Sequence, residues 1–398
     1  MANFLFIVQG EGKGHMTQAI ALYEMLIENG HEVVATMVGV ANGRKIPNFY
    51  TQAIDAPIIT FESPSLFYGK GKAPNMLRTI LSQTIKAKQF FKNADKVHQV
   101  VSQYEPDIII NFYEMAAGFY NFFYRPTIPI ICVGHQYLLL HNHFINIKNK
   151  KFDRYLLQLN TRMTAIGAAK KLALSFYPLP NDDKENINVV PPLLRKQVKE
   201  KFIENEKFIL AYVTHHKIVE DLIDWHSKNN HQTIHCFIDK KSLKSSLQFN
   251  DNFFIHQIDS DHFLDKMAQC EALVCTAGFE SVCEAMYMGK PVMMVPVKNH
   301  IEQRINAHDG EKAGAGIYCK SFKINRLIKY LPSHIDKTEQ FVEWERNAEN
   351  LFLENILTVL ENSKHKKVVN NPISKPNYSV VRLLKEVFKK KSYKLSID

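Results

Sequence analysis

Residues 274–306 have the sequence VCTAGFESVCEAMYMGKPVMMVPVKNHIEQRIN. Residues 272–276 are apolar, Gly278 interrupts the run, residues 281–288 have helical character, and residues 291–297 are apolar again. This order predicts a strand, a tight turn, a helix, a second strand, a loop and a second helix. Gly278 is therefore expected at a helix N-terminus, just beyond the carboxyl end of a buried strand.

Polar side chains follow both predicted helix starts. Near Ser281, free backbone N–H groups and the positive end of the helix dipole suit a diphosphate. Glu284 lies one helical turn later on the same face, where its carboxylate can accept hydrogen bonds from two vicinal hydroxyls, as on a ribose. Glu302, Gln303 and Asn306 open the second helix, and Gln303 shares a face with Asn306. Such short polar groups can bind the hydroxyls of a sugar.

The stretch resembles the donor half of GT-B glycosyltransferases, in particular the families of the peptidoglycan N-acetylglucosaminyltransferase and the UDP-glucuronosyltransferases. Those families have a small-residue Gly turn, a helix with a Glu, a Gly-Lys-Pro strand and an acidic-Gln-x-x-Asn helix start, and all of these stand here in order. The resemblance implies a donor site made of Gly278 and Ser281 at the diphosphate, Glu284 at the ribose, and Glu302 and Gln303 at the sugar, with Phe279 and Asn306 beside them. The residues alone also allow an ordinary αβ unit in which Gly278 only turns the chain and Glu284 is solvated.

The composition indicates two globular domains without a membrane span. The chain has 398 residues, 45% of them hydrophobic, which is enough for two sizeable cores. No apolar run approaches the roughly 18 residues that cross a bilayer. Residues 4–8 are too short an apolar run for a signal peptide, so export is not expected. The six cysteines include no C-x-x-C pair, and we expect reduced core thiols in a cytoplasmic protein.

The first turn of the chain contains Gly10-Glu-Gly-Lys-Gly-His15 between a predicted strand at 4–8 and a predicted helix at 16–28. It lacks a full dinucleotide fingerprint, and Lys13 is not followed by Ser or Thr as a phosphate-binding P-loop requires. The turn does resemble the Gly-His pair of the same GT-B families. That resemblance implies that Gly14 lies at the donor and that His15 is the base that deprotonates the acceptor, with its pKa lowered by the helix N-terminus. The alternative is that His15 only contacts donor phosphate or caps the helix. Many relatives carry a Pro shortly after this His, and this chain does not.

Two further strands, expected at 106–111 and 127–133, lead into polar residues. Strand carboxyl ends line the ligand crevice of an open α/β sheet. Glu114, His135 and Gln136 are therefore acceptor-side candidates, with loop residues that have no such role as the alternative.

The predicted organisation is α/β, with two Rossmann-like domains that face each other across a cleft, as in GT-B enzymes. The N-terminal, acceptor-side domain covers 1–192, a charged linker covers 193–207, the nucleotide-sugar domain covers 208–362, and a basic tail covers 363–398. Relatives contact donor phosphate at the position of Thr214, and residues 256–258 resemble the segment whose backbone binds the nucleotide base.

Net charge is +10 and the pI is near 9.1, which favours a polyanionic surface as a partner. A basic amphipathic segment at 77–92 and the lysine-rich end can dock on anionic lipid, although both could equally be solvated faces. Nucleic acid is not expected, because no base-stacking pattern accompanies the basic end. Lipid is favoured because GT-B relatives often glycosylate lipid-linked acceptors.

Metal binding and cofactors are not expected. The local histidine pairs lack a carboxylate at ligand spacing, and the single Asp-x-Asp, which begins at Asp259, is interpreted as a helix N-cap.

The sequence thus predicts a metal-independent glycosyltransferase that moves a hexose or N-acetylhexosamine from a nucleotide diphosphate sugar to an acceptor hydroxyl. UDP is the expected nucleotide, and a lipid-linked acceptor would supply the hydroxyl. The alternatives are a UDP-sugar 2-epimerase and a non-catalytic protein that binds a nucleotide sugar or an anionic surface. The expected location is the cytoplasm or the inner face of the membrane.

Overall fold

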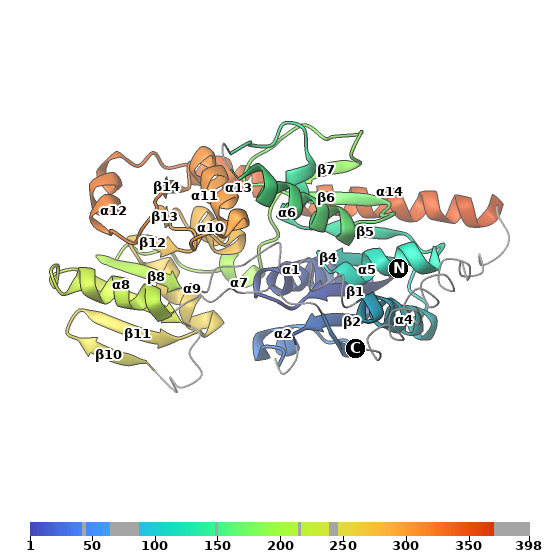
Figure 1. Ribbon diagram of the computed structural model, residues 1–398, viewed down its shortest axis with the longest axis horizontal. Coiled ribbons are helices and arrows are strands. Elements are labelled where there is room, and N and C mark those ends of the chain that lie inside the picture. The colour runs from blue at the N-terminus through green and yellow to red at the C-terminus, as the bar shows by residue number, and fades with distance from the viewer. Residues whose placement is uncertain (42–44, 64–86, 148–149, 214–215, 239–245, 370–398) are drawn as a thin grey trace, which may run out of the picture.

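A computed structural model describes residues 1–41, 45–63, 87–147, 150–213, 216–238 and 246–369. Thr214, most of the basic segment 77–92 and the tail from 370 lie outside the described residues. Within them the chain forms two α/β domains side by side along the long axis of the molecule (Figure 1).

The first domain is built on a parallel sheet. Among the described residues this sheet has seven strands in the order β3-β2-β1-β4-β5-β6-β7. The strands are β1 (Asn3–Gln9), β2 (Glu32–Val40), β3 (Ile58–Glu62), β4 (Ile108–Phe112), β5 (Ile130–Val133), β6 (Lys170–Leu174) and β7 (Ile187–Val190). The helices are α1 (Gly14–Glu28), α2 (Asn48–Ala53), α4 (Ala87–Tyr104), α5 (Met115–Tyr124), the 3-10 helix η1 (His135–Leu140) and α6 (Lys151–Thr164).

The second domain repeats this plan with an antiparallel edge. Its described strands follow the order β10-β11-β9-β8-β12-β13-β14, and only the pair β10·β11 is antiparallel. The strands are β8 (Phe208–Val213), β9 (Thr233–Ile238), β10 (Leu247–Asn250), β11 (Phe253–Gln257), β12 (Ala272–Cys275), β13 (Val292–Met294) and β14 (Gly316–Tyr318). The helices are α8 (His216–His226), α9 (Ser260–Gln269), α10 (Phe279–Tyr287), α11 (Ile301–Ala313), α12 (Asn325–Tyr330) and the 3-10 helix η2 (Leu331–Ser333).

The central strands β4, β5 and β12 are apolar, apart from Asn111 of β4, because helices cover both faces of each sheet. Every residue of β4, β5 and β12 is buried. Parallel strands buried on both faces have continuous apolar runs in place of an alternating pattern. This is why the strands expected from residues 106–111, 127–133 and 272–276 are found at those places. All six cysteines are free and buried, which agrees with their expected place in the core.

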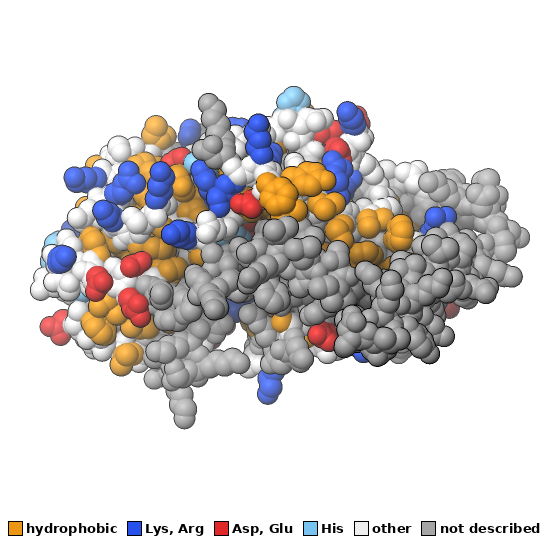
Figure 2. All heavy atoms as spheres, viewed as in Figure 1, with side chains coloured by type: hydrophobic (Ala, Val, Ile, Leu, Met, Phe, Trp, Pro, Cys, Tyr) orange, Lys and Arg blue, Asp and Glu red, His pale blue; other side chains and the backbone are white. Residues whose placement is uncertain are grey.

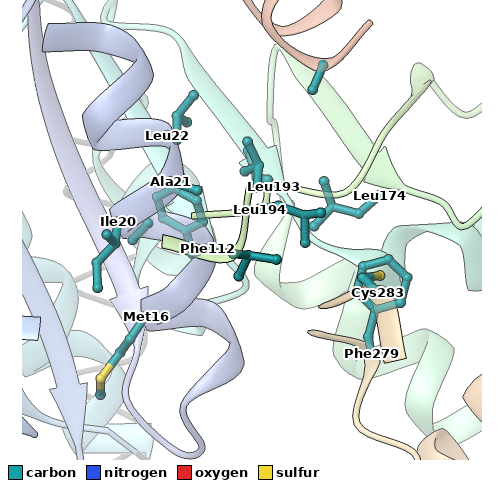
Figure 3. Packing of buried hydrophobic residues seen from close by; sticks show 14 of the residues in the cluster. Met16, Ile20, Ala21, Leu22, Phe112, Leu174, Leu193, Leu194, Phe279 and Cys283 are labelled. Carbon is teal, nitrogen blue, oxygen red and sulfur yellow. The ribbon is translucent and has the colours of Figure 1, made fainter. Parts of the chain in front are cut away.

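The segment between the domains is packed. It contains the short helix α7 (Lys196–Lys199), and Leu193, Leu194 and Val198 are 1%, 6% and 1% exposed. Figure 3 shows the two leucines between Leu22 of α1 and the α10 residues Phe279 and Cys283. One apolar cluster therefore continues from the first domain, through this segment, into the second.

The end of the described chain returns to the first domain. The sequence predicts a single helix from about residue 337 to 362, but the structure has two, α13 (Thr338–Arg346) and α14 (Ala348–Val369). Helix α14 packs against β7 and contacts β6 (Figure 1). Phe352 and Ile356 are fully buried, and Lys170 Nζ donates to Asn355 Oδ1 at 3.2 Å. The helix extends through residue 369, so it includes the first residues of the predicted tail.

Over the described ranges, none of the helices combines the length and apolar character that crossing a membrane requires.

Candidate active site

A cavity of about 670 Å³ lies where the two domains meet. Its walls come from the β1–α1 turn and the exits of β4 and β5 on one side, and from α9, α10 and α11 on the other. The cavity brings together residues predicted from both halves of the sequence. These are Gly14, His15, Glu114, His135, Gln136, Gly278, Phe279, Ser281, Glu284, Glu302, Gln303 and Asn306.

The start of α10 has the form expected of an anion site. Gly278 is the N-cap residue, and as a glycine it has no side chain that could cap the helix. The turn before it is tight, because Ala277 has a left-handed backbone with φ of 59°. Ser281 Oγ donates to the Gly278 carbonyl oxygen at 3.3 Å, which keeps this hydroxyl at the edge of the cavity. An uncapped helix start facing a cavity can bind a negatively charged group.

Glu284 is buried and paired with a residue that the sequence analysis did not select. Arg195 Nη2 donates to Glu284 Oε1 at 2.8 Å, and the two side chains are 8% and 6% exposed. Arg195 Nη1 also donates to Ser260 Oγ at 2.6 Å. The structure thus excludes the alternative of a solvated Glu284. Arg195 was missed because it opens a charged run that resembled an exposed linker.

Helix α11 presents the other predicted donor residues. Gln136 Nε2 donates to Glu302 Oε1 across the interface at 2.9 Å, and burial raises the pKa of Glu302. Gln303 Oε1 accepts the Val297 N–H at 2.9 Å, so its amide N–H groups stay available. Asn306 Nδ2 donates to the Ala277 carbonyl oxygen at 3.3 Å and holds the α10 turn in place.

His15 lies on the opposite wall with both ring nitrogens in contact with amides. Its side chain is 8% exposed, and the ring stacks on Tyr113 with 5.5 Å between centroids. Nδ1 is 3.1 Å from Gln18 Oε1, and Nε2 is 3.3 Å from Gln136 Nε2. Burial lowers the pKa of His15 to about 4, so the ring is neutral near pH 7. The lowered pKa was expected, but its leading cause is burial and not the helix N-terminus.

Gln18 connects His15 to the second domain. Gln18 Nε2 donates to Glu280 Oε1 at 2.5 Å, and Glu280 is 9% exposed. Burial raises the pKa of Glu280 to about 8. Neither residue was predicted as part of the site, because a Gln and a Glu near the starts of two separate helices resemble ordinary solvated side chains.

The family of the chain follows from a comparison with family models. The model described as glycosyl transferase family 1 matches residues 2–333. The chain belongs to glycosyl transferase family 1. An uncharacterized glycosyltransferase from Methanosarcina mazei is 24% identical over 343 residues, which are 79% of this chain and 84% of that protein.

Solved glycosyltransferase structures share the fold. Phytolacca americana UGT2, solved with UDP-2fluoro-glucose and pterostilbene, aligns with a TM-score of 0.62 at 12% identity, covering 91% of this chain and 100% of that one. Acinetobacter baumannii MurG aligns with a TM-score of 0.52 at 16% identity, covering 90% and 100%. The GT-B fold and the glycosyltransferase activity expected from the sequence are confirmed.

Of the three acceptor-side candidates of this glycosyltransferase, Glu114 and His135 differ in their surroundings. Glu114 caps α5, accepting the Ala116 N–H at 3.2 Å, and also accepts the Ser63 hydroxyl at 2.9 Å. Burial raises the pKa of Glu114 to about 7. His135 instead takes part in packing between the domains, because its ring stacks on Phe279 with 4.0 Å between centroids. Its Nδ1 donates to the Leu174 carbonyl oxygen at 2.8 Å, and burial lowers its pKa to about 4.

The Asp-x-Asp of the glycosyltransferase has the structural role expected of it. Asp259 is the N-cap of α9 and its side chain accepts the His262 N–H at 2.9 Å. In the part of the chain that the structure describes, no three His, Cys, Asp or Glu side chains are placed to share a metal ion.

Proposed function

We propose that this glycosyltransferase uses a UDP-sugar, carrying a hexose or an N-acetylhexosamine, and transfers the sugar to an acceptor hydroxyl with His15 as the base. One observation carries the proposal: His15 and the uncapped start of α10 line the same cavity from opposite domains. A base on one wall and an anion site on the other are the two requirements for attack by a hydroxyl and departure of a diphosphate.

The donor would extend along the second domain. Ile258, Phe263 and Tyr212 line the cavity and suit a nucleoside. Glu284 would lie at the ribose hydroxyls, since Arg195 links it to Ser260, close in sequence to Ile258 and Phe263. The diphosphate would lie at Gly278 and Ser281, where the N–H groups of α10 stabilise the charge that develops on the leaving group. Glu302 and Gln303 would then hold the sugar close to His15.

The acceptor would reach the cavity over the first domain, where Glu114 lies, and its chemistry is that of a hydroxyl-bearing molecule at an anionic lipid surface. The net charge of +10 supports this proposal. So does the basic face in Figure 2, where Lys and Arg side chains gather over α11 and α12. In and just before α12, Lys320, Lys323, Arg326 and Lys329 are all exposed.

A nucleotide-sugar panel tests the donor. UDP and UDP-sugars should raise the unfolding temperature, whereas GDP- and TDP-sugars at equal concentration should raise it less, because only a bound ligand stabilises the folded state. Mass analysis of the product after addition of a hydroxyl acceptor then separates transfer from 2-epimerisation, since only transfer releases UDP with a glycosylated acceptor. Absence of stabilisation by every nucleotide would overturn the proposed function.

A further inference from the structure

Three buried side chains form a chain of hydrogen bonds from His15 into the second domain. His15 Nδ1 is 3.1 Å from Gln18 Oε1, and Gln18 Nε2 is 2.5 Å from Glu280 Oε1. The three residues are 8%, 2% and 9% exposed. His15 and Gln18 belong to α1 of the first domain, whereas Glu280 belongs to α10 of the second.

The direction of each bond follows from what each atom can do. Gln18 donates its amide N–H to Glu280 Oε1, and this oxygen can accept the bond both when the carboxyl group is ionised and when it carries its proton on Oε2. The Gln18 carbonyl oxygen then faces His15, and because a carbonyl oxygen only accepts, the ring proton must be on Nδ1. Nε2 is left with its lone pair, and a ring nitrogen with a free lone pair is what a base requires.

The other side of the ring leads independently to the same tautomer. Glu302 Oε1 accepts from Gln136 Nε2 at 2.9 Å, which turns this amide group toward His15 as well. Gln136 Nε2 lies 3.3 Å from His15 Nε2, and an amide nitrogen only donates. His15 Nε2 must therefore accept. Carboxyl groups of the second domain thus orient both amides that contact the base of the first.

We propose that Glu280 is a positioning residue that acts across the cleft: through Gln18 it fixes the proton of His15 on Nδ1, so that the base has its reactive tautomer only while the two domains are together. This inference rests on the proposed role of His15 as the base. Gln136 cannot keep this function during turnover, because the acceptor hydroxyl must replace it at Nε2. Gln18 lies on the far side of the ring and can stay.

The close approach of the two helices supports the assignment. A Cβ atom at Gly14 would lie only 3.2 Å from Glu280 Cγ, so the absence of a side chain there lets α10 reach α1. The second oxygen of Glu280, Oε2, is buried without a hydrogen-bond partner among the described residues. The cost of burying this carboxyl group is offset by few contacts other than the bond to Gln18, which indicates a function beyond packing.

The test reads the tautomer directly and needs no substrate. Protein labelled with ¹⁵N-histidine is examined by NMR at about pH 7, where a ring with a pKa near 4 is neutral. The His15 signals are assigned from their loss in His15→Gln. The wild type should show a protonated Nδ1 and an unprotonated Nε2. In Glu280→Leu, and separately in Gln18→Leu, the two nitrogen shifts should move toward each other as the tautomers mix.

A rescue variant distinguishes positioning from packing. In Gln18→Glu/Glu280→Leu, the carboxylate at position 18 accepts from Nδ1 without help from the second domain, so the wild-type tautomer should return. The rate of UDP release should change in parallel with the tautomer. It should fall about 10- to 100-fold in Glu280→Leu and recover in the rescue variant. A wild-type tautomer in both leucine variants, or a rescue variant without the wild-type tautomer, would overturn the inference. Full activity in His15→Ala would instead overturn the proposed function and leave the NMR result to decide on Glu280.

Discussion

The Glu284 side chain is held in the cleft by a cation from outside the second sheet. Arg195 follows the last strand of the first domain, and its guanidinium contacts Glu284 and Ser260 together. A buried ion pair loses much of its attraction to desolvation, so it is weak evidence for stability. It does fix the direction of the carboxylate, and this is what a ribose site requires.

Replacement of Glu284 by Ala should weaken UDP binding at least about tenfold, which corresponds to roughly 1.4 kcal/mol, because two charge-assisted hydrogen bonds to the ribose are lost. Calorimetry with UDP measures the change. Glu302→Ala is the matched control: it removes a carboxylate from the sugar end of the same cavity and should leave UDP affinity within about twofold. Equal UDP affinity in wild type and Glu284→Ala would remove Glu284 from the donor site.

We propose His15 as the base, and in that role its pKa would set the pH dependence of transfer. Because burial lowers this pKa to about 4, the base is neutral across the neutral range, and kcat/KM should be flat there and fall only as pH drops through about 4. His15→Ala should lower turnover by about 100-fold or more, while UDP affinity changes little. The fall in kcat/KM at low pH should be absent in this variant. A UDP-release assay over pH with a parallel UDP titration checks both. Loss of UDP binding equal to the loss of rate would make His15 a phosphate contact.

The sequence could predict the site residues that follow a motif and not those that depend on the meeting of two domains. Glu284 and Gln303 stand at fixed spacings after recognisable strands. Gln18, Arg195 and Glu280 acquire their roles only because α1, α7 and α10 converge, and no local pattern encodes that convergence.

At the level of elements, the sequence located the strands and helices that have a continuous or periodic run of apolar residues. The buried strand β12 and the helix α10 fall where the sequence placed them. Strands β3 and β10 were not predicted, because β3 is only partly buried and every residue of β10 is exposed. The break between α13 and α14 at Asn347 was missed because no Gly or Pro marks it.

Helix α14 should stabilise the first domain strongly through one face. Phe352→Ala should lower the free energy of unfolding by about 3–5 kcal/mol, because Phe352 is fully buried against the first domain. Leu357→Ala on the same helix is the control, since Leu357 is 42% exposed and should cost less than about 1 kcal/mol. Urea unfolding of the three proteins measures the difference. Similar costs for both substitutions would show that α14 does not pack as described.

At the level of the whole molecule, the excess positive charge predicts reversible binding to anionic membranes. Each basic residue near such a surface contributes about 1 kcal/mol and is screened by salt. Co-sedimentation with vesicles should therefore require anionic lipid and fall steeply as salt rises. It should weaken in a variant with Lys86, Lys88 and Lys92 replaced by Gln, and in one with Lys320, Lys323 and Lys329 replaced by Gln.

Two controls separate charge-dependent binding from other causes of co-sedimentation and from loss of fold. Neutral vesicles of the same size test for binding without charge, and circular dichroism of each Gln variant tests for loss of fold. Equal binding to neutral and anionic vesicles, or no binding at low salt, would show that the basic surfaces are only solvated and that the acceptor need not be at a membrane.

In the described part of the chain, the backbone passes between the domains twice, once through α7 and once between α13 and α14. An ion pair between Lys199 Nζ and Glu345 Oε1, 2.6 Å apart, ties the two passages together. Two adjacent connections joined in this way would limit a relative movement of the domains to a rotation about them. Such a rotation would break and remake the Gln18–Glu280 and Gln136–Glu302 contacts together. One movement of the domains would therefore control both contacts that we propose to fix the tautomer of His15.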